Sequence, residues 1–168
     1  MKIWILVFST FFFIGNGKAQ FASTEESVAV QQKTIPPFEL QTVSKTIFTK
    51  DKLKKNVPLI IIFFSPTCEH CLHQMDDMMK RVKDFSKFQI VMATFQPVEE
   101  LVEFNKKYQL SKHPNFTTGW DEKYILPPFF RLQTFPYFAF YDKGGKLLST
   151  HEGNISVDKI LKRMKGGK

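Results

Sequence analysis

Cysteine is scarce in this chain, whose 168 residues include two, Cys68 and Cys71. The chain can therefore form at most one intrachain disulfide, and that bridge would span two intervening residues. Such a small loop removes little conformational entropy from the unfolded chain, so the bridge would be a poor structural staple. The spacing argues against a structural disulfide and in favour of chemistry at the sulfur atoms.

A hydrophobic segment of the length that crosses a bilayer, about 20 residues, is also lacking. The apolar run at residues 3–14 is shorter, follows a lysine, and precedes small and polar residues that end at Ala19. This order is typical of a secretory signal peptide. We expect cleavage after Ala19 to remove residues 1–19 and leave no stable membrane span; an uncleaved anchor is the alternative. No cysteine lies near the cleavage site, which excludes attachment as a lipoprotein.

Nucleic-acid-binding motifs and internal repeats are lacking as well. The formal net charge is +8, but the lysines are scattered and are typical of solvated faces. We therefore expect no nucleic-acid partner.

Residues 20–37 end at a Pro-Pro pair and are interpreted as a linker or edge segment. Residues 38–168 are long enough for one domain. The expected location is the periplasm or cell envelope, or the medium outside the cell.

Strand and helix patterns alternate along the domain. Residues 57–64 are apolar on both faces, which is typical of a central strand buried on both sides. Helical spacing of apolar residues begins at Glu69 and continues to Phe85. The other expected elements are strands within 38–48, 89–95 and 116–120, a helical turn at 49–53, helices at 97–108, 122–126 and 157–164, and a hairpin of 137–141 with 146–150. This order predicts an α/β fold with a central mixed sheet flanked by helices.

The two cysteines lie where the predicted central strand gives way to a helix. A cysteine at a helix start faces unpaired N–H groups and the positive end of the macrodipole, which stabilise a thiolate. Cys68 is therefore the predicted nucleophile. Cys71 lies about one helical turn further on, where it can attack a mixed disulfide formed at Cys68. Cys71 is the predicted resolving thiol.

Three features together resemble the thioredoxin-like superfamily: the strand, Cys-x-x-Cys and helix at 58–85, the Thr134-Phe135-Pro136 step before a strand, and the closing hairpin and helix at 137–165. Residues 65–71 are most similar to the exported TlpA/ResA-type thiol-disulfide oxidoreductases of bacterial envelopes. The resemblance implies a thioredoxin-like fold and a cis bond before Pro136, with Phe135 and Pro136 beside the dithiol as the client-binding residues.

The same resemblance implies an enzyme that reduces or exchanges disulfides in exported proteins. Its partners would be protein thiols and disulfides of those clients and a separate redox protein. It needs no cofactor beyond the redox-active disulfide between Cys68 and Cys71. A peroxidase of the related peroxiredoxin family would need a proline and a threonine where this chain has Ile61 and Ser65, so peroxidase activity is disfavoured.

Two departures from the superfamily pattern bear on the chemistry. Many thioredoxins have a buried acid six residues before the first cysteine, where this chain has Ile62, so another group or water must accept the proton of the resolving thiol. Between the cysteines lie Glu69 and His70, which we expect to tune the redox potential in opposite directions. His70 favours the reduced form by stabilising a thiolate, and Glu69 disfavours it. The resemblance favours a reductant or exchange role.

Two other functions remain open on the sequence. Cys68, His70, Cys71 and His73 offer thiolate and imidazole ligands that suit Cu(I) or zinc. We expect His70 and His73 to follow different directions around the helix start, so that all four do not bind one metal. The other alternative is a redox-inactive binding module. Dithiol exchange is the favoured hypothesis, with no metal assigned.

Overall fold

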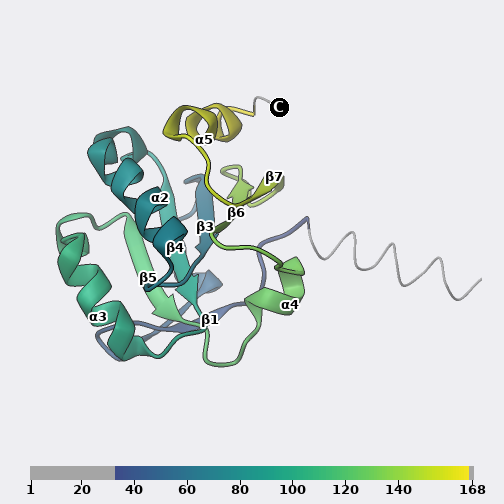
Figure 1. Cartoon of the computed structure of the whole chain (residues 1–168). Helices are drawn as coiled ribbons and strands as arrows, with labels where there is room; N and C mark the ends of the chain where they lie inside the picture. The colour runs from purple at the N-terminus through teal and green to yellow at the C-terminus, as the bar shows by residue number, and fades with distance from the viewer. Residues whose placement is uncertain (1–32, 167–168) are drawn as a thin grey trace, which may run out of the picture.

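The computed structural model describes residues 33–166 of the chain (Figure 1). The predicted signal peptide at 1–19 and residues 20–32 of the predicted linker lie outside the described residues. The last part of the linker contacts the domain, because the Leu147 N–H donates to Lys33 O at 3.0 Å. Within the described range, no helix has the length and apolar character needed to cross a bilayer.

One seven-stranded sheet runs through the domain in the order β2-β1-β5-β4-β3-β6-β7. β3 pairs with β4 and β4 with β5 in parallel, and all other neighbours are antiparallel. The sheet is therefore mixed, as predicted. Its strands are β1 (Glu39–Gln41), β2 (Ile47–Thr49), β3 (Leu59–Phe63), β4 (Gln89–Thr94), β5 (Phe116–Trp120), β6 (Tyr137–Tyr141) and β7 (Leu147–Glu152).

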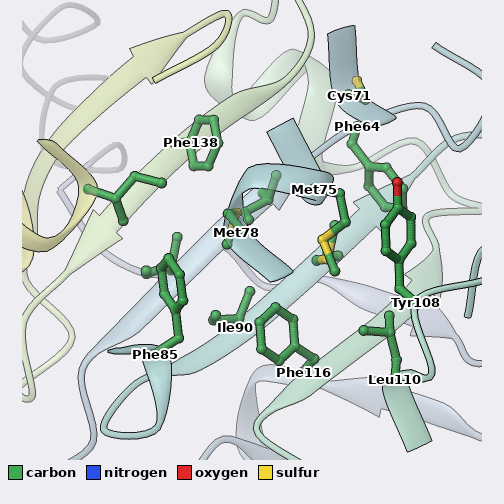
Figure 2. Close-up of a cluster of buried hydrophobic side chains, with 14 of the residues drawn as sticks. Phe64, Cys71, Met75, Met78, Phe85, Ile90, Tyr108, Leu110, Phe116 and Phe138 are labelled. Carbon is green, nitrogen blue, oxygen red and sulfur yellow. The ribbon is translucent and has the colours of Figure 1, made fainter. Parts of the chain in front are cut away.

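Helices cover both faces of this sheet. The α-helices are α2 (Glu69–Lys80), α3 (Val98–Lys107), α4 (Leu126–Phe130) and α5 (Val157–Met164), and the short 3-10 helices are η1 (Lys50–Lys52), η2 (Val82–Phe85) and η3 (Leu110–Lys112). Buried residues of α2, α3 and α5 share one hydrophobic cluster, part of which Figure 2 shows, whereas α4 contributes to a second cluster. The helices thus form a layer on each side of the sheet (Figure 1).

The apolar run at 57–64 contains β3, an inner strand of the sheet that is buried on both sides, as predicted. Its side chains alternate between the two clusters: Ile60 and Ile62 join the first, and Ile61 and Phe63 join the second. All four side chains are at most 2% exposed. Because a strand directs successive side chains to opposite faces, a strand covered on both sides must be apolar throughout.

Glycine in β5 permits close packing at the β1 side of the sheet. A Cβ atom at Gly119 would lie 2.6 Å from Leu40 Cβ, which is too close for any side chain. The segment predicted as strand over 38–48 is in fact two short strands, β1 and β2. The turn between them is held by bonds such as that from the Lys45 N–H to Thr42 O at 2.8 Å.

The predicted helix at 122–126 is wrong in position. The helix begins at Leu126, and the buried Asp121 carboxylate accepts hydrogen bonds from the Ile125 N–H at 3.0 Å and the Leu126 N–H at 2.8 Å. Pro127 and Pro128 fit the first turn because the N–H groups there have no partner within the helix. Asp121 thus determines where α4 starts.

The helix predicted from Glu69 to Phe85 is interrupted. α2 ends at Lys80, and Arg81 has φ −123° and ψ 29°, outside the helical range. The Arg81 guanidinium forms ion pairs with Asp84 and with Asp158 on α5. The chain then continues as η2, which still buries Phe85 in the first cluster.

Candidate dithiol site

The two cysteines differ in exposure although they are one helical turn apart. Cys68 is the residue directly before α2 and is partly exposed, with an extended backbone at φ −78° and ψ 122°. Cys71 lies in the first turn of α2 and is 3% exposed. Both are free thiols. Figure 2 shows Cys71 beside Phe64, at the edge of the buried cluster.

The surroundings of Cys71 keep it protonated. Burial raises the pKa of the Cys71 thiol to about 12, and a hydrogen bond with the neighbouring Cys68 side chain raises it as well. The backbone N–H of Ser65 donates to Cys71 Sγ at 3.5 Å and acts in the opposite direction. Ile62, which occupies the position of the buried acid of many thioredoxins, is 2% exposed and packs in the same cluster as Cys71. In the part of the chain that the structure describes, no carboxylate hydrogen-bonds Cys71.

A polar network supports the loop before Cys68. The Ser65 hydroxyl bonds Gln96 Oε1 at 2.7 Å, and Gln96 Nε2 donates to Thr67 Oγ1 at 3.1 Å. Ser65 is therefore fixed by its side chain while its N–H contacts the Cys71 sulfur. Gln96 carries no signal in the sequence that points to this role. It follows β4, and because β3 and β4 are parallel their carboxyl ends meet at one edge of the sheet.

Phe135 and Pro136 lie at this edge too. The Phe135–Pro136 peptide bond is cis, as predicted. β6 is antiparallel to β3 with Tyr137 opposite Phe63, so the residues before Tyr137 lie at the end of β3 that leads to Cys68. Pro136 is buried. Phe135 is partly buried and packs against both hydrophobic clusters, one of which also contacts Cys68.

An exposed aromatic ring, also missed by the sequence analysis, completes this edge. Phe95 is 43% exposed although it lies next to the core. Its ring centroid is 6.3 Å from that of Phe63 and 5.9 Å from that of Phe135. Trp120 Nε1 donates to Phe95 O at 3.1 Å and fixes the backbone there. An apolar surface of Phe95 and Phe135 therefore adjoins the dithiol loop.

Glu69 and His70, the residues between the cysteines, are both exposed. The backbone of His70 is held in place, because Asn154 Nδ2 donates to His70 O at 2.9 Å. One turn further on, Gln74 is 3% exposed and exchanges two hydrogen bonds with the backbone of Ile155. The start of α2 is thus tied to the loop that precedes α5.

The directions of the two histidines differ from the prediction. His70 and His73 line one pocket of about 470 Å³ together with Asp77, because residues three apart share a face of a helix. His73 Nδ1 lies 3.5 Å from Asp77 Oδ2. Within residues 33–166, no group of three or more His, Cys, Asp or Glu side chains is placed to hold a metal ion.

Comparison with known proteins agrees with this geometry. Residues 31–148 match the model of the AhpC/TSA family. The chain is 24% identical over 109 residues to the thioredoxin-like protein SkfH of Bacillus subtilis, an alignment that covers 64% of this chain and 77% of SkfH.

Solved structures show the same fold. A secreted Mycobacterium tuberculosis disulfide oxidoreductase, described as homologous to Escherichia coli DsbE, is 21% identical with a TM-score of 0.64, covering 77% of this chain and 95% of that one. StoA of Bacillus subtilis is 17% identical with a TM-score of 0.59, covering 77% and 98%. A Neisseria meningitidis protein described as a putative thioredoxin is 24% identical with a TM-score of 0.65, covering 79% and 88%. The chain therefore belongs to the AhpC/TSA family and has a thioredoxin-like fold.

Proposed function

We propose that the protein is an exported thiol-disulfide oxidoreductase that reduces or exchanges disulfides in proteins of the cell envelope. The observation that carries this proposal is the asymmetry of the cysteine pair. Cys68 is accessible at the start of α2, whereas Cys71 is buried and in hydrogen-bond contact with it. Cys68 Sγ can react with a client protein, whereas Cys71 Sγ can react only with Cys68.

The reaction follows from that division. The Cys68 thiolate attacks one sulfur of a client disulfide, and the other client sulfur leaves as a thiolate. Cys71 then loses its proton and attacks Cys68, which releases the second client sulfur and closes the Cys68–Cys71 disulfide. Two electrons pass from the protein to the client, and a separate dithiol partner must restore the reduced form. No cofactor beyond this disulfide is needed.

Proton removal from Cys71 is the demanding step. With Ile62 in place of an acid, water is the proposed acceptor of the Cys71 proton. In the mixed disulfide Cys68 is no longer a thiolate. The electrostatic repulsion by Cys68, one of the causes that raise the pKa of Cys71, is therefore removed. The Ser65 N–H stabilises the thiolate that remains.

Clients are proposed to bind at the edge formed by Phe135 and Pro136. Phe95 extends this edge with an exposed ring, and apolar surface next to a reactive sulfur suits an unfolded or partly folded client. A peroxidase is not proposed, because Ile61 and Ser65 occupy the positions of its proline and threonine. Glu69 and His70 are proposed to tune the potential, with a reductant or exchange role preferred.

Trapping with single-cysteine variants tests the division of roles. A Cys71→Ser variant should accumulate mixed disulfides through Cys68, whereas a Cys68→Ser variant should not. Each reduced variant would be mixed with disulfide-bonded client proteins, and the intermolecular disulfides formed would be counted on non-reducing gels. Equal trapping by both variants would overturn the assignment of nucleophile and resolving thiol.

Export is a separate part of the proposal. It is supported by the pattern of residues 1–19 and by relatives that are described as secreted or as an exposed lipoprotein. N-terminal sequencing of protein recovered from the periplasm or medium should begin at Gln20 or within a few residues of it. A cytoplasmic product that begins at Met1 would contradict export. It would not affect the proposed dithiol exchange, which the trapping experiment tests independently.

A further inference from the structure

A groove of about 560 Å³ lies beside the dithiol loop, between the start of α2 and one side of α3. Both helices lie on the same side of the sheet (Figure 1). Thr67, the residue before Cys68, is part of the lining, so the groove begins one residue from the nucleophile. The rest of the lining is apolar at Pro66, Leu72 and Phe104 and charged at Glu99, Glu100, Glu103 and Lys107.

One carboxylate in the groove lacks a donor. Among the described residues, Glu100 Oε2 is shielded from solvent and has no hydrogen-bond partner. A buried acceptor left in this way costs about 1–3 kcal/mol. If the Glu100 side chain turned so that Oε2 faced the groove, an ammonium or guanidinium group bound there would supply the missing donor together with an opposite charge.

The charge of the groove is opposite to that of the protein. The whole chain carries a formal net charge of +8, yet three carboxylates line the groove against a single lysine. That lysine, Lys107, holds its Nζ 5.0 Å from the centroid of the Tyr108 ring. The charge of the groove therefore complements a cationic ligand.

We propose that this groove binds a basic segment of the client polypeptide, next to the client cysteine that Cys68 attacks. This inference rests on the proposed function and specifies its substrate. A lysine or arginine can lay its methylene stem along Leu72 and Phe104 while its charged end reaches the α3 carboxylates. Since Thr67 adjoins Cys68, the basic residues lie within a few positions of the client cysteine.

Three peptides of equal length test this selectivity. Each has one cysteine as a mixed disulfide with thionitrobenzoate, flanked by lysine, glutamine or glutamate. Cys68 attacks the peptide sulfur and the coloured thionitrobenzoate anion leaves, so its absorbance gives the rate. With the reduced protein, the lysine peptide should react on the order of tenfold faster than the glutamate peptide at low salt.

Charge-neutral variants locate the effect. The triple variant Glu99→Gln, Glu100→Gln and Glu103→Gln should reduce that preference to about twofold. Glu100→Gln alone should remove part of the preference for the lysine peptide over the glutamate peptide. Asp51→Asn is the matched single control, because Asp51 is an exposed acid beside the opposite end of β3 and should retain the full preference.

Binding without chemistry separates this proposal from the proposed function. Fluorescent peptides with serine in place of cysteine would be titrated against the Cys68→Ser protein, and anisotropy should favour the lysine peptide. Equal exchange rates and equal binding for all three peptides would overturn the groove proposal. The exchange itself would still support the proposed function. Selective binding without exchange would support the groove and reject the proposed function. Equally tight binding of spermidine would identify a small-cation site and overturn the polypeptide assignment.

Discussion

The rings of Phe95 and Phe135 lie 5.9 Å apart, one at the end of β4 and the other just before β6. Phe95 remains 43% exposed despite this contact. The pair therefore offers an apolar face to a protein that approaches Cys68. We expect a small disulfide to reach Cys68 Sγ without contacting that face.

Phe95→Ala should lower kcat/KM for a disulfide-bonded client protein about fivefold, because buried aromatic contacts dominate binding at protein interfaces. The rate with a small aromatic disulfide should stay within about twofold of wild type, because only a protein client would lose the contact with the Phe95 ring. Ile47→Ala is the control, because Ile47 is 42% exposed on the outer strand β2. Equal losses on both substrates would show that Phe95 supports the reactive loop itself.

Gln74→Leu should destabilise the protein by about 2–4 kcal/mol. The substitution leaves the N–H and the carbonyl of Ile155 without their partners in a buried position, and each lost partner costs about 1–3 kcal/mol. Urea unfolding at neutral pH measures the change. Gln133→Leu, at an exposed position, should stay within about 0.5 kcal/mol of wild type. Similar effects of the two substitutions would show that the bonds to Ile155 contribute little.

The reduced protein should lose stability as the pH rises above about 9. Burial raises the pKa of Cys71 from 9.0 in the unfolded chain to about 12 in the folded protein, so the unfolded state releases the proton first. The contribution of this thiol is complete below pH 9 and is lost as the pH rises toward 12.

A comparison with Cys71→Ser isolates that thiol from the tyrosines that titrate in the same range. Between pH 8 and 9.5 the free energy of unfolding of the wild type should fall by about 0.8 kcal/mol more than that of the variant. Urea unfolding under a reducing agent gives both values. Parallel curves for the two proteins would mean that the thiol titrates alike in the folded and unfolded states.

The reduction potential tests the proposed tuning by Glu69 and His70. Known dithiols of this kind span about −270 to −120 mV, and we expect the wild type nearer the reducing end. His70→Ala should lower the potential further, because a positive charge that favours the thiolate is removed, whereas Glu69→Gln should raise it. Equilibration against glutathione measures all three. A wild-type value near −120 mV that falls sharply in His70→Ala would reject the reductant role.

The sequence predicted the position of the cysteine pair at a helix start, because that position depends on neighbours along the chain. An apolar run before Cys68 and a helical pattern after it suffice to place a cysteine at a helix start. The cis bond before Pro136 was implied by the resemblance of the surrounding elements. Gln96 has no such local signal, because its contact with Ser65 arises from the pairing of β3 with β4 in space.

The errors in the helices have a related cause. The start of α4 depends on Asp121, whose carboxylate is buried at the end of β5 and accepts two N–H groups of the following turn. The end of α2 at Lys80 involves an ion pair between Arg81 and Asp158, which is distant in the sequence. Apolar periodicity continues past Lys80 to Phe85, whereas glycine and proline interrupt it on both sides of Asp121, so periodicity indicated neither boundary.

The bonds from Gln74 to Ile155 and from Asn154 to His70 join residues 81 and 84 positions apart. During synthesis, and during the proposed export, the cysteines emerge well before Asn154 and Ile155. A nascent or truncated chain that ends before these residues has both sulfur atoms but lacks the anchors at the start of α2. Assembly of the cysteine site is therefore tied to completion of the chain, and an unfinished chain offers two similar thiols in place of one accessible and one buried thiol.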